Sequence, residues 1–171
     1  MIRILGSLLL IGGATVIGVC ASNELSTRAR VLESFLPALD IMRSEIGNCL
    51  TPVSELMVKL SREAPHPLDK LFLLCEKEKR ERPDVPFSLI WTKSITQAEN
   101  LKLKSNEKDV LRELGSVLGR YSAEEQVSAI SHIMRRVSTL AESAAEDKKR
   151  LGKLYAKLGV ICGVALVIVL I

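Results

Sequence analysis

The stretch that decides the fold is Ser122–Ile171, SAEEQVSAISHIMRRVSTLAESAAEDKKRLGKLYAKLGVICGVALVIVLI. It begins with Ser122-Ala-Glu-Glu125, the spacing of a capping box, in which the first and fourth side chains bond each other's backbone N–H groups. Apolar residues then recur every three or four positions, and residues 158–171 carry no charge. This order predicts a helix that begins in water and ends in lipid.

Residues 154–171 form the predicted C-terminal membrane span, continuous with the last helix of the body. At about 1.5 Å per residue they cover about 27 Å, close to the hydrocarbon thickness, if Lys153 and Lys157 extend toward the headgroups. Ten of the last fourteen residues are Leu, Ile or Val. A helix buried in a soluble core would keep a polar face, and residues 158–171 have none, so we expect the segment to span the membrane.

Residues 4–23 form a second uncharged segment, long enough at about 30 Å of helix to cross the bilayer. A cleaved signal peptide is the alternative, because Val19-Cys20-Ala21 resembles a cleavage site. However, Arg3 is the one basic residue before the apolar run, whereas a signal peptide begins with a positively charged region. The run is also longer than the apolar region of an ordinary signal peptide. An uncleaved N-terminal anchor is therefore favoured.

The distribution of Lys and Arg predicts the orientation. Of the 24 basic residues, all except Arg3 lie between the two uncharged runs, residues 4–23 and 158–171. The positive-inside rule then places residues 24–153 in the cytoplasm and both termini across the membrane. The alternative for the basic flanks is a topology signal without a specific lipid partner. The basic residues nearest the membrane, which we expect to face its lipids, are Arg28, Arg30, Lys148, Lys149, Arg150, Lys153 and Lys157.

The central region is predicted to be all-α, an antiparallel bundle of about six helices. One-sided apolar stripes run over about 26–48, 52–65, 67–82, 86–101, a segment ending near 118, and from 122 onward, with Gly and Pro between them. Thr51 is the expected N-cap of the second helix, and Trp91 an expected core anchor. Pro37 is expected to kink or split the first helix. Gly119 is expected to end the fifth helix.

The sequence offers little catalytic chemistry. It contains no phosphate-binding glycine loop, no HExxH and no GxSxG, and its histidines, His66 and His132, have no second ligand at metal-binding spacing. The four cysteines lack metal-ligand spacing, and we expect them to be reduced thiols. Few aromatic residues and a net charge of +4 disfavour nucleic-acid binding. We therefore expect a non-enzymatic protein without a cofactor.

The turn before Ser122 carries two residues that helix capping does not require, Arg120 and Gln126. They could satisfy backbone groups inside the bundle or contact a partner protein, and both interpretations stay open here. They are our candidate partner-binding residues.

Several segments resemble the stage III sporulation protein AB family over essentially the whole chain. The most specific is Leu114-Gly115-x-x-Leu118-Gly119-x-x-Ser122-x-x-x-Gln126. The others are the glycine-spaced N-terminal anchor, Leu39 through Glu45-Ile46, Thr51-Pro52, and the ending Leu158-Gly159-Val-Ile-Cys-Gly163.

This resemblance implies a subunit of the envelope-spanning, secretion-like channel complex between mother cell and forespore, located in the mother-cell membrane. It implies similarity to the cytoplasmic helical domain of the inner-membrane platform proteins of type II secretion and type IV pilus machines. The expected role is assembly with other subunits of the complex, including a cytoplasmic secretion-type ATPase. A membrane-tethered signalling or regulatory module is the alternative. A pore-forming protein is a third, disfavoured because neither residues 4–23 nor residues 158–171 carry a charge.

Overall fold

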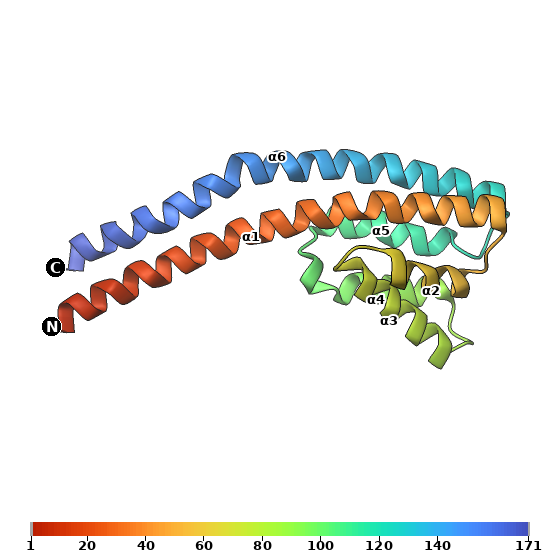
Figure 1. The fold of residues 1–171 in the computed structure, drawn as a ribbon, viewed down its shortest axis with the longest axis horizontal. Coiled ribbons are helices and arrows are strands. Elements are labelled where there is room, and N and C mark those ends of the chain that lie inside the picture. Colours follow the sequence, from red (N-terminus) through yellow and green to blue (C-terminus); the bar gives the residue numbers. More distant parts are fainter. Residues whose placement is uncertain (1, 171) are drawn as a thin grey trace. The chain divides into compact units, whose positions relative to one another are not determined.

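The structure is a computed structural model that describes the backbone of residues 2–170 and the side chains of residues 13, 16, 18–152, 154, 155 and 161. Every regular element in this part of the chain is helical, which confirms the predicted all-α class with six α-helices (Figure 1). The elements are α1 (Ile2–Ser44), the π-helical turn η1 (Glu45–Cys49), α2 (Val53–Glu63), α3 (Leu68–Glu81), α4 (Phe87–Gln97), the 3-10 turn η2 (Glu99–Leu101), α5 (Ser105–Val117) and α6 (Ala123–Leu170).

The chain divides into two compact units. One contains residues 1–29 and 142–171, and the other, here called the body, contains residues 30–141. The continuity of α6 beyond residue 153 agrees with the prediction of one uninterrupted last helix. The sequence bounds of 24–153 for a cytoplasmic bundle stay a prediction.

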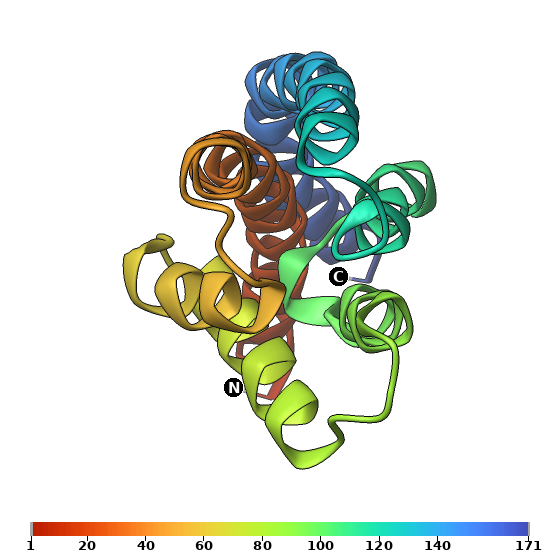
Figure 2. The same cartoon turned by 90° about the vertical axis from the view of Figure 1, so that its right-hand side faces the viewer.

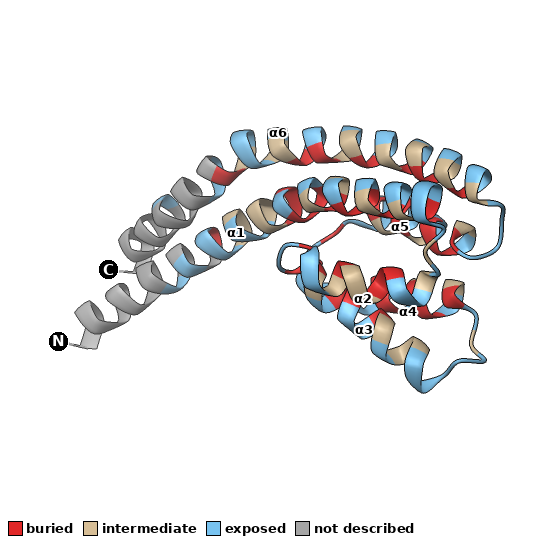
Figure 3. Ribbon diagram, turned by 45° about the vertical axis from the view of Figure 1, so that its right-hand side comes forward, coloured by how far each residue is buried: buried red, intermediate tan, exposed pale blue. Residues whose placement is uncertain are grey.

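Trp91 lies at the centre of the body. Its side chain is fully buried, and its ring lies 6.0 Å from those of both Phe72 and Phe87. Its indole N–H donates to the carbonyl of Leu111 on α5 at 2.6 Å. The prediction of Trp91 as a core anchor is therefore confirmed. Within the body α2 packs on α3, α3 on α4 and α4 on α5, and their buried faces point inward (Figure 3).

Pro37 does not split the first helix. The helix α1 runs unbroken from Ile2 to Ser44 with Pro37 inside it, so the expectation of a break there is wrong. The proline is exposed, and the buried side chains of Phe35, Ala38 and Leu39 flank it. Proline removes one backbone donor, and the packing of these neighbours holds the helix across that loss.

The predicted spans fall mostly outside the described side chains. Within the part of the chain that the structure describes, no helix is both long and apolar enough to cross a membrane. Residues 4–23 and 154–170 are helical in backbone, but most of their side chains lie outside the described residues. The same holds for the side chains of Lys153 and Lys157.

Gly115 on α5 makes the close approach of Trp91 possible. A Cβ atom at this position would lie 2.5 Å from Cδ1 of Trp91 and 2.9 Å from its Cβ, closer than real side-chain contacts allow. The helix α5 therefore presents a bare backbone patch to the indole. This contact accounts for Gly115, the first of the two glycines in the segment Leu114-Gly115-x-x-Leu118-Gly119.

We predict that Gly115→Ala destabilises the protein by about 1–3 kcal/mol, the usual cost of overpacking a core. The loss exceeds the gain of at most about 1 kcal/mol in helix propensity. Chemical denaturation of the purified chain measures it, with Ser116→Ala, the exposed next residue, as the matched control. A Gly115→Ala protein as stable as the control would contradict this packing.

Candidate functional site

The candidate site is a corner of the body formed by two chain reversals, residues 46–53 and residues 119–126. The first leads from η1 into α2, and the second from α5 into α6. Figure 2 views the molecule from the end that carries both reversals. Together they line a depression of about 250 Å³, whose lining residues are Ile46, Leu50, Thr51, Pro52, Val53, Gly119, Ala123 and Gln126.

The side chain of Gln126 ties the second reversal together. Its Oε1 accepts from the backbone N–H of Gly119 at 3.0 Å, and its Nε2 donates to the carbonyl of Tyr121 at 2.8 Å. The residue is only 9% exposed. Of the two interpretations left open by the sequence, satisfaction of backbone groups therefore describes Gln126. Arg120 is exposed in the same turn and forms no ion pair within the described part of the chain.

The glycine and serine of this turn behave as the sequence predicted. Gly119 has φ of +74°, a conformation that side chains disfavour, and it follows the last residues of α5 as a C-cap glycine does. The capping box is present: Ser122 N–H donates to Glu125 at 3.0 Å, and Glu125 N–H donates to the Ser122 hydroxyl at 3.3 Å. Gly115, Gly119, Ser122 and Gln126 are thus each required by local geometry.

The first reversal is held by a carboxylate that the sequence did not single out. Glu45 accepts from Lys59 Nζ at 2.7 Å and from the Thr51 hydroxyl at 2.8 Å. The expectation of Thr51 as N-cap is wrong, because its hydroxyl is engaged by Glu45 and Pro52 occupies the cap position. Glu45 and Lys59 are 14 residues apart on different helical elements, a spacing that no local pattern marks.

These bonds shift both titrating groups. The hydrogen bonds from Lys59 and then Thr51 hold the pKa of Glu45 below its ordinary value, and the bond to Glu45 holds the pKa of Lys59 above its ordinary value. The Glu45 contribution to stability is therefore present at neutral pH and lost as pH falls through its folded pKa. The Lys59 contribution is lost as pH rises through its folded pKa.

Leu50 is the unusual residue of the corner. Its φ of 54° and ψ of 32° lie in the left-handed region, where an L-residue other than glycine pays about 1–2 kcal/mol. Its backbone N–H ends η1 by donating to Glu45. Yet Leu50 is 70% exposed, so the burial of its side chain within the described protein offsets little of the free energy that this backbone conformation costs. Tyr121, in the other reversal, is also exposed, at 55%.

The depression is suited to an apolar group. None of its lining side chains is charged. Its two polar side chains already form hydrogen bonds within the protein. Gln126 bonds the backbone of Gly119 and Tyr121, and the Thr51 hydroxyl donates to Glu45. Such a surface can receive an aliphatic or aromatic side chain but offers no group for acid–base chemistry.

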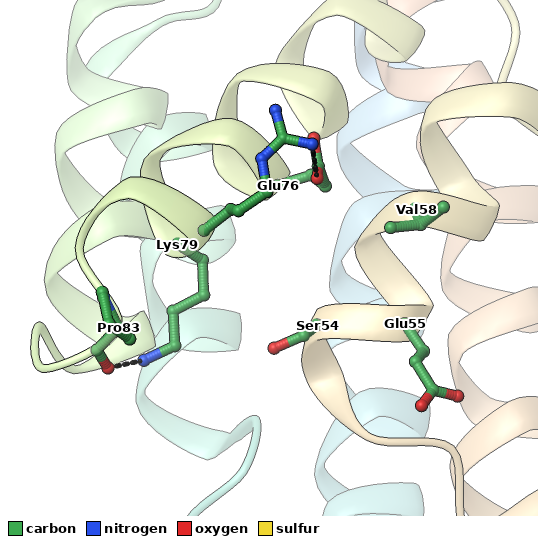
Figure 4. Close-up of a pocket in the computed structure, with 7 residues that line it drawn as sticks. Ser54, Glu55, Val58, Glu76, Lys79 and Pro83 are labelled. Atoms are coloured by element: carbon green, nitrogen blue, oxygen red, sulfur yellow. Dashed lines mark hydrogen bonds and ion pairs between the residues drawn. The ribbon is translucent and has the colours of Figure 1, made fainter.

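A second depression, of about 320 Å³, lies between α2 and α3 and is lined by Ser54, Glu55, Val58, Glu76, Lys79, Arg80 and Pro83 (Figure 4). Its cations are engaged locally. Lys79 donates to the carbonyls of Pro83 and Val85 at 2.7 and 2.9 Å, and Arg80 pairs with Glu76 at 3.1 Å. These bonds stabilise the end of α3, so this groove presents no cation ready for a ligand.

No metal-binding cluster is found in the described residues. No three His, Cys, Asp or Glu side chains there gather as a metal site. His66 is exposed and lies 3.1 Å from Asp69, and His132 is exposed on α6. Cys75 is buried, which raises the pKa of its thiol to about 11 despite a hydrogen bond with Ser94.

The basic residues expected to face lipid differ among themselves. Arg28 is 5% exposed, and its guanidinium lies 2.8 Å from Asp147, so it is directed at a carboxylate where a lipid-facing side chain was expected. The pairing removes the cost of burying an isolated charge. Arg30 and the three consecutive residues Lys148, Lys149 and Arg150 are exposed.

We predict that Glu45→Gln destabilises the protein at neutral pH and that this difference from wild type shrinks in acid, as the pH falls through the folded pKa of Glu45, which lies below its ordinary value. Urea denaturation of both proteins across the acid range measures it. Glu124→Gln, an exposed acid in the first turn of α6, is the control. A difference that stays constant with pH would rule out this role for the Glu45 charge.

Comparison with known proteins supplies the family. Residues 3–171 match the family model of stage III sporulation protein AB. Stage III sporulation protein AB of Bacillus subtilis (strain 168) is 23% identical over 174 residues, which cover 99% of both chains. A solved structure of a stage III sporulation protein AB shares the fold, with a TM-score of 0.65 and 19% identity over 72% of this chain and 98% of the other. The chain therefore belongs to the stage III sporulation protein AB family.

Proposed function

We propose that this chain is a non-enzymatic membrane subunit of a secretion-like channel complex between mother cell and forespore, required for endospore formation. In this role it acts as an assembly platform for partner proteins. Its membership of a sporulation family supports the cellular process. The corner formed by residues 46–53 and 119–126 supplies the surface on which a partner can dock.

The two apolar segments anchor the platform. Residues 4–23 and 154–171 cross the mother-cell membrane, and the charge distribution puts residues 24–153 in the cytoplasm. In support, α1 and α6 continue as unbroken helical backbone through residues 4–23 and 154–170. Backbone groups in the hydrocarbon layer must be hydrogen-bonded internally, which a continuous helix achieves.

The observation that carries the platform role is the backbone strain at Leu50. Glycine would adopt the left-handed conformation at this position without strain. The exposed leucine side chain forms few contacts within this chain that could offset the strain. Strain of this kind concentrates at functional positions. Leu50 also lines the apolar depression of the corner. Burial of this leucine side chain by a partner protein would offset the strain of its backbone.

The partner is a cytoplasmic component of the same complex, and a secretion-type ATPase fits best. Its support is the likeness to the platform proteins of type II secretion and type IV pilus machines that the family resemblance in the sequence implies. The uncharged corner calls for an apolar anchor residue on the partner. Arg120, exposed in the adjacent turn, can add an ion pair at the rim of the interface.

We predict opposite effects of Leu50→Gly on stability and on function. The free energy of unfolding stays equal or rises by up to about 1 kcal/mol, since relief of backbone strain offsets the added freedom of the unfolded chain. Spore formation in an endospore-forming host whose own copy is replaced by the variant falls at least about tenfold, because loss of a central apolar anchor commonly removes more than about 1.4 kcal/mol of binding.

Lys102→Gly is the matched control, because Lys102 has the same φ of 54° and is exposed in a different turn. It should relieve a comparable strain and leave spore formation at the wild-type level. Normal spore formation with Leu50→Gly would contradict the docking role. An equal loss in both variants would attribute the effect to the backbone rather than to the leucine side chain.

A further inference from the structure

The unit that contains residues 142–171 carries a compact basic surface, the basic collar, made of Lys148, Lys149 and Arg150. All three side chains are exposed, and none forms an ion pair within the described part of the chain. Successive residues of an α-helix point about 100° apart, so the three cations surround most of the helix. The collar therefore presents positive charge in several directions at one level of α6.

The residue that precedes the collar is an acid, Asp147, and its charge is already compensated. Arg28 on α1 reaches it at 2.8 Å, and the Arg28 side chain is 6% exposed against 30% for Asp147. Close packing continues farther along, since a Cβ at Gly152 would lie 3.3 Å from the hydroxyl of Ser22. The Arg28–Asp147 pair thus keeps a carboxylate from neutralising the cations beside it.

Lys149 and Arg150 also border a depression of about 440 Å³, together with Glu146 and Asp147. Asp147 is paired with Arg28. The other charged side chains that border this depression are one exposed carboxylate, Glu146, and two exposed cations, Lys149 and Arg150. A hollow bordered by lysine and arginine suits a phosphate group, which arginine can bind through two parallel N–H donors.

The residues that follow the collar point to a bilayer as the source of that phosphate. Leu154 and Tyr155 are exposed at 47% and 39%, and Ile161 is exposed at 61%. The three cations are followed by Leu154 and Tyr155 and then by Ile161, an order that follows the profile of headgroup, interface and hydrocarbon. A site for a soluble phosphate compound has no need of the exposed apolar residues next to it.

We propose that the basic collar binds the phosphate groups of anionic phospholipids, and that Arg28 is a positioning residue that holds Asp147 away from them. This inference rests on the membrane location in the proposed function and adds the lipid class. It also separates the predicted basic residues into two roles. Lys148, Lys149 and Arg150 contact lipid, and Arg28 acts through a carboxylate of its own chain.

The test uses the full chain reconstituted in phosphatidylcholine bilayers with a trace of spin-labelled phosphatidylglycerol or spin-labelled phosphatidylcholine. Electron paramagnetic resonance gives the fraction of each label that the protein immobilises. Each Lys or Arg near an anionic surface is worth about a fivefold preference. The wild-type chain should therefore retain the phosphatidylglycerol label at least about fivefold more strongly, and about 1 M salt should remove the difference.

The triple variant Lys148→Gln, Lys149→Gln, Arg150→Gln should lose most of the preference for phosphatidylglycerol. Its control is Arg62→Gln, Lys70→Gln, Arg135→Gln, which removes the same charge from exposed positions of the body and should keep the preference. If the collar triple keeps the wild-type preference, or the control triple loses as much, the collar is not the binding surface.

The positioning role of Arg28 is tested by neutralising first Arg28 alone and then both Arg28 and Asp147. Arg28→Gln alone exposes the Asp147 charge to the collar and should lower the preference for phosphatidylglycerol. Adding Asp147→Asn should restore it, although the ion pair is absent in both variants. If the double variant stays as weak as the single one, Arg28 has no positioning role. If the wild-type chain immobilises neither label, the membrane location itself fails, whereas immobilisation of both labels without preference overturns only the lipid class.

Discussion

The packing of Trp91 against the bare backbone of α5 is the contact on which the body depends. The indole is fully buried, touches the rings of Phe72 and Phe87, and donates to the carbonyl of Leu111. It joins α3, α4 and α5 in one core, and the approach requires a glycine at position 115. Because interiors are packed nearly as densely as crystals, this contact fixes where α5 lies and therefore where its end, at Gly119, meets the start of α6.

The corner follows from that placement. Gln126 closes the turn after Gly119, and Glu45 ties the opposite reversal to α2 through Lys59. Two reversals stapled by buried or half-buried polar side chains form a firm frame, and Leu50 projects from it on a strained backbone. A hydrogen-bonded frame that presents exposed Leu50 and Tyr121 is suited to docking, since less conformational entropy is lost when a partner binds a preorganised surface.

Local signals in the sequence predicted a large part of this structure, and long-range ones did not. The capping box at Ser122, the glycine at 119 and the helical stripes depend on residues within a few positions, and the structure confirms them. Leu50 in the left-handed region had no such signal, because glycine or asparagine normally marks it. The pairing of Arg28 with Asp147 spans 119 residues, so a rule based on charge near a membrane assigned Arg28 to lipid.

The central claim, a membrane platform whose body lies in the cytoplasm, is tested most directly through Cys49. This thiol is exposed in the corner, whereas Cys75 is buried and serves as an internal unreactive control. In a Cys20→Ser, Cys162→Ser background, a membrane-impermeant maleimide should leave Cys49 unlabelled in intact cells and label it once the membrane is permeabilised. Equal labelling of Cys49 in intact cells would place the body outside the cytoplasm and contradict the account.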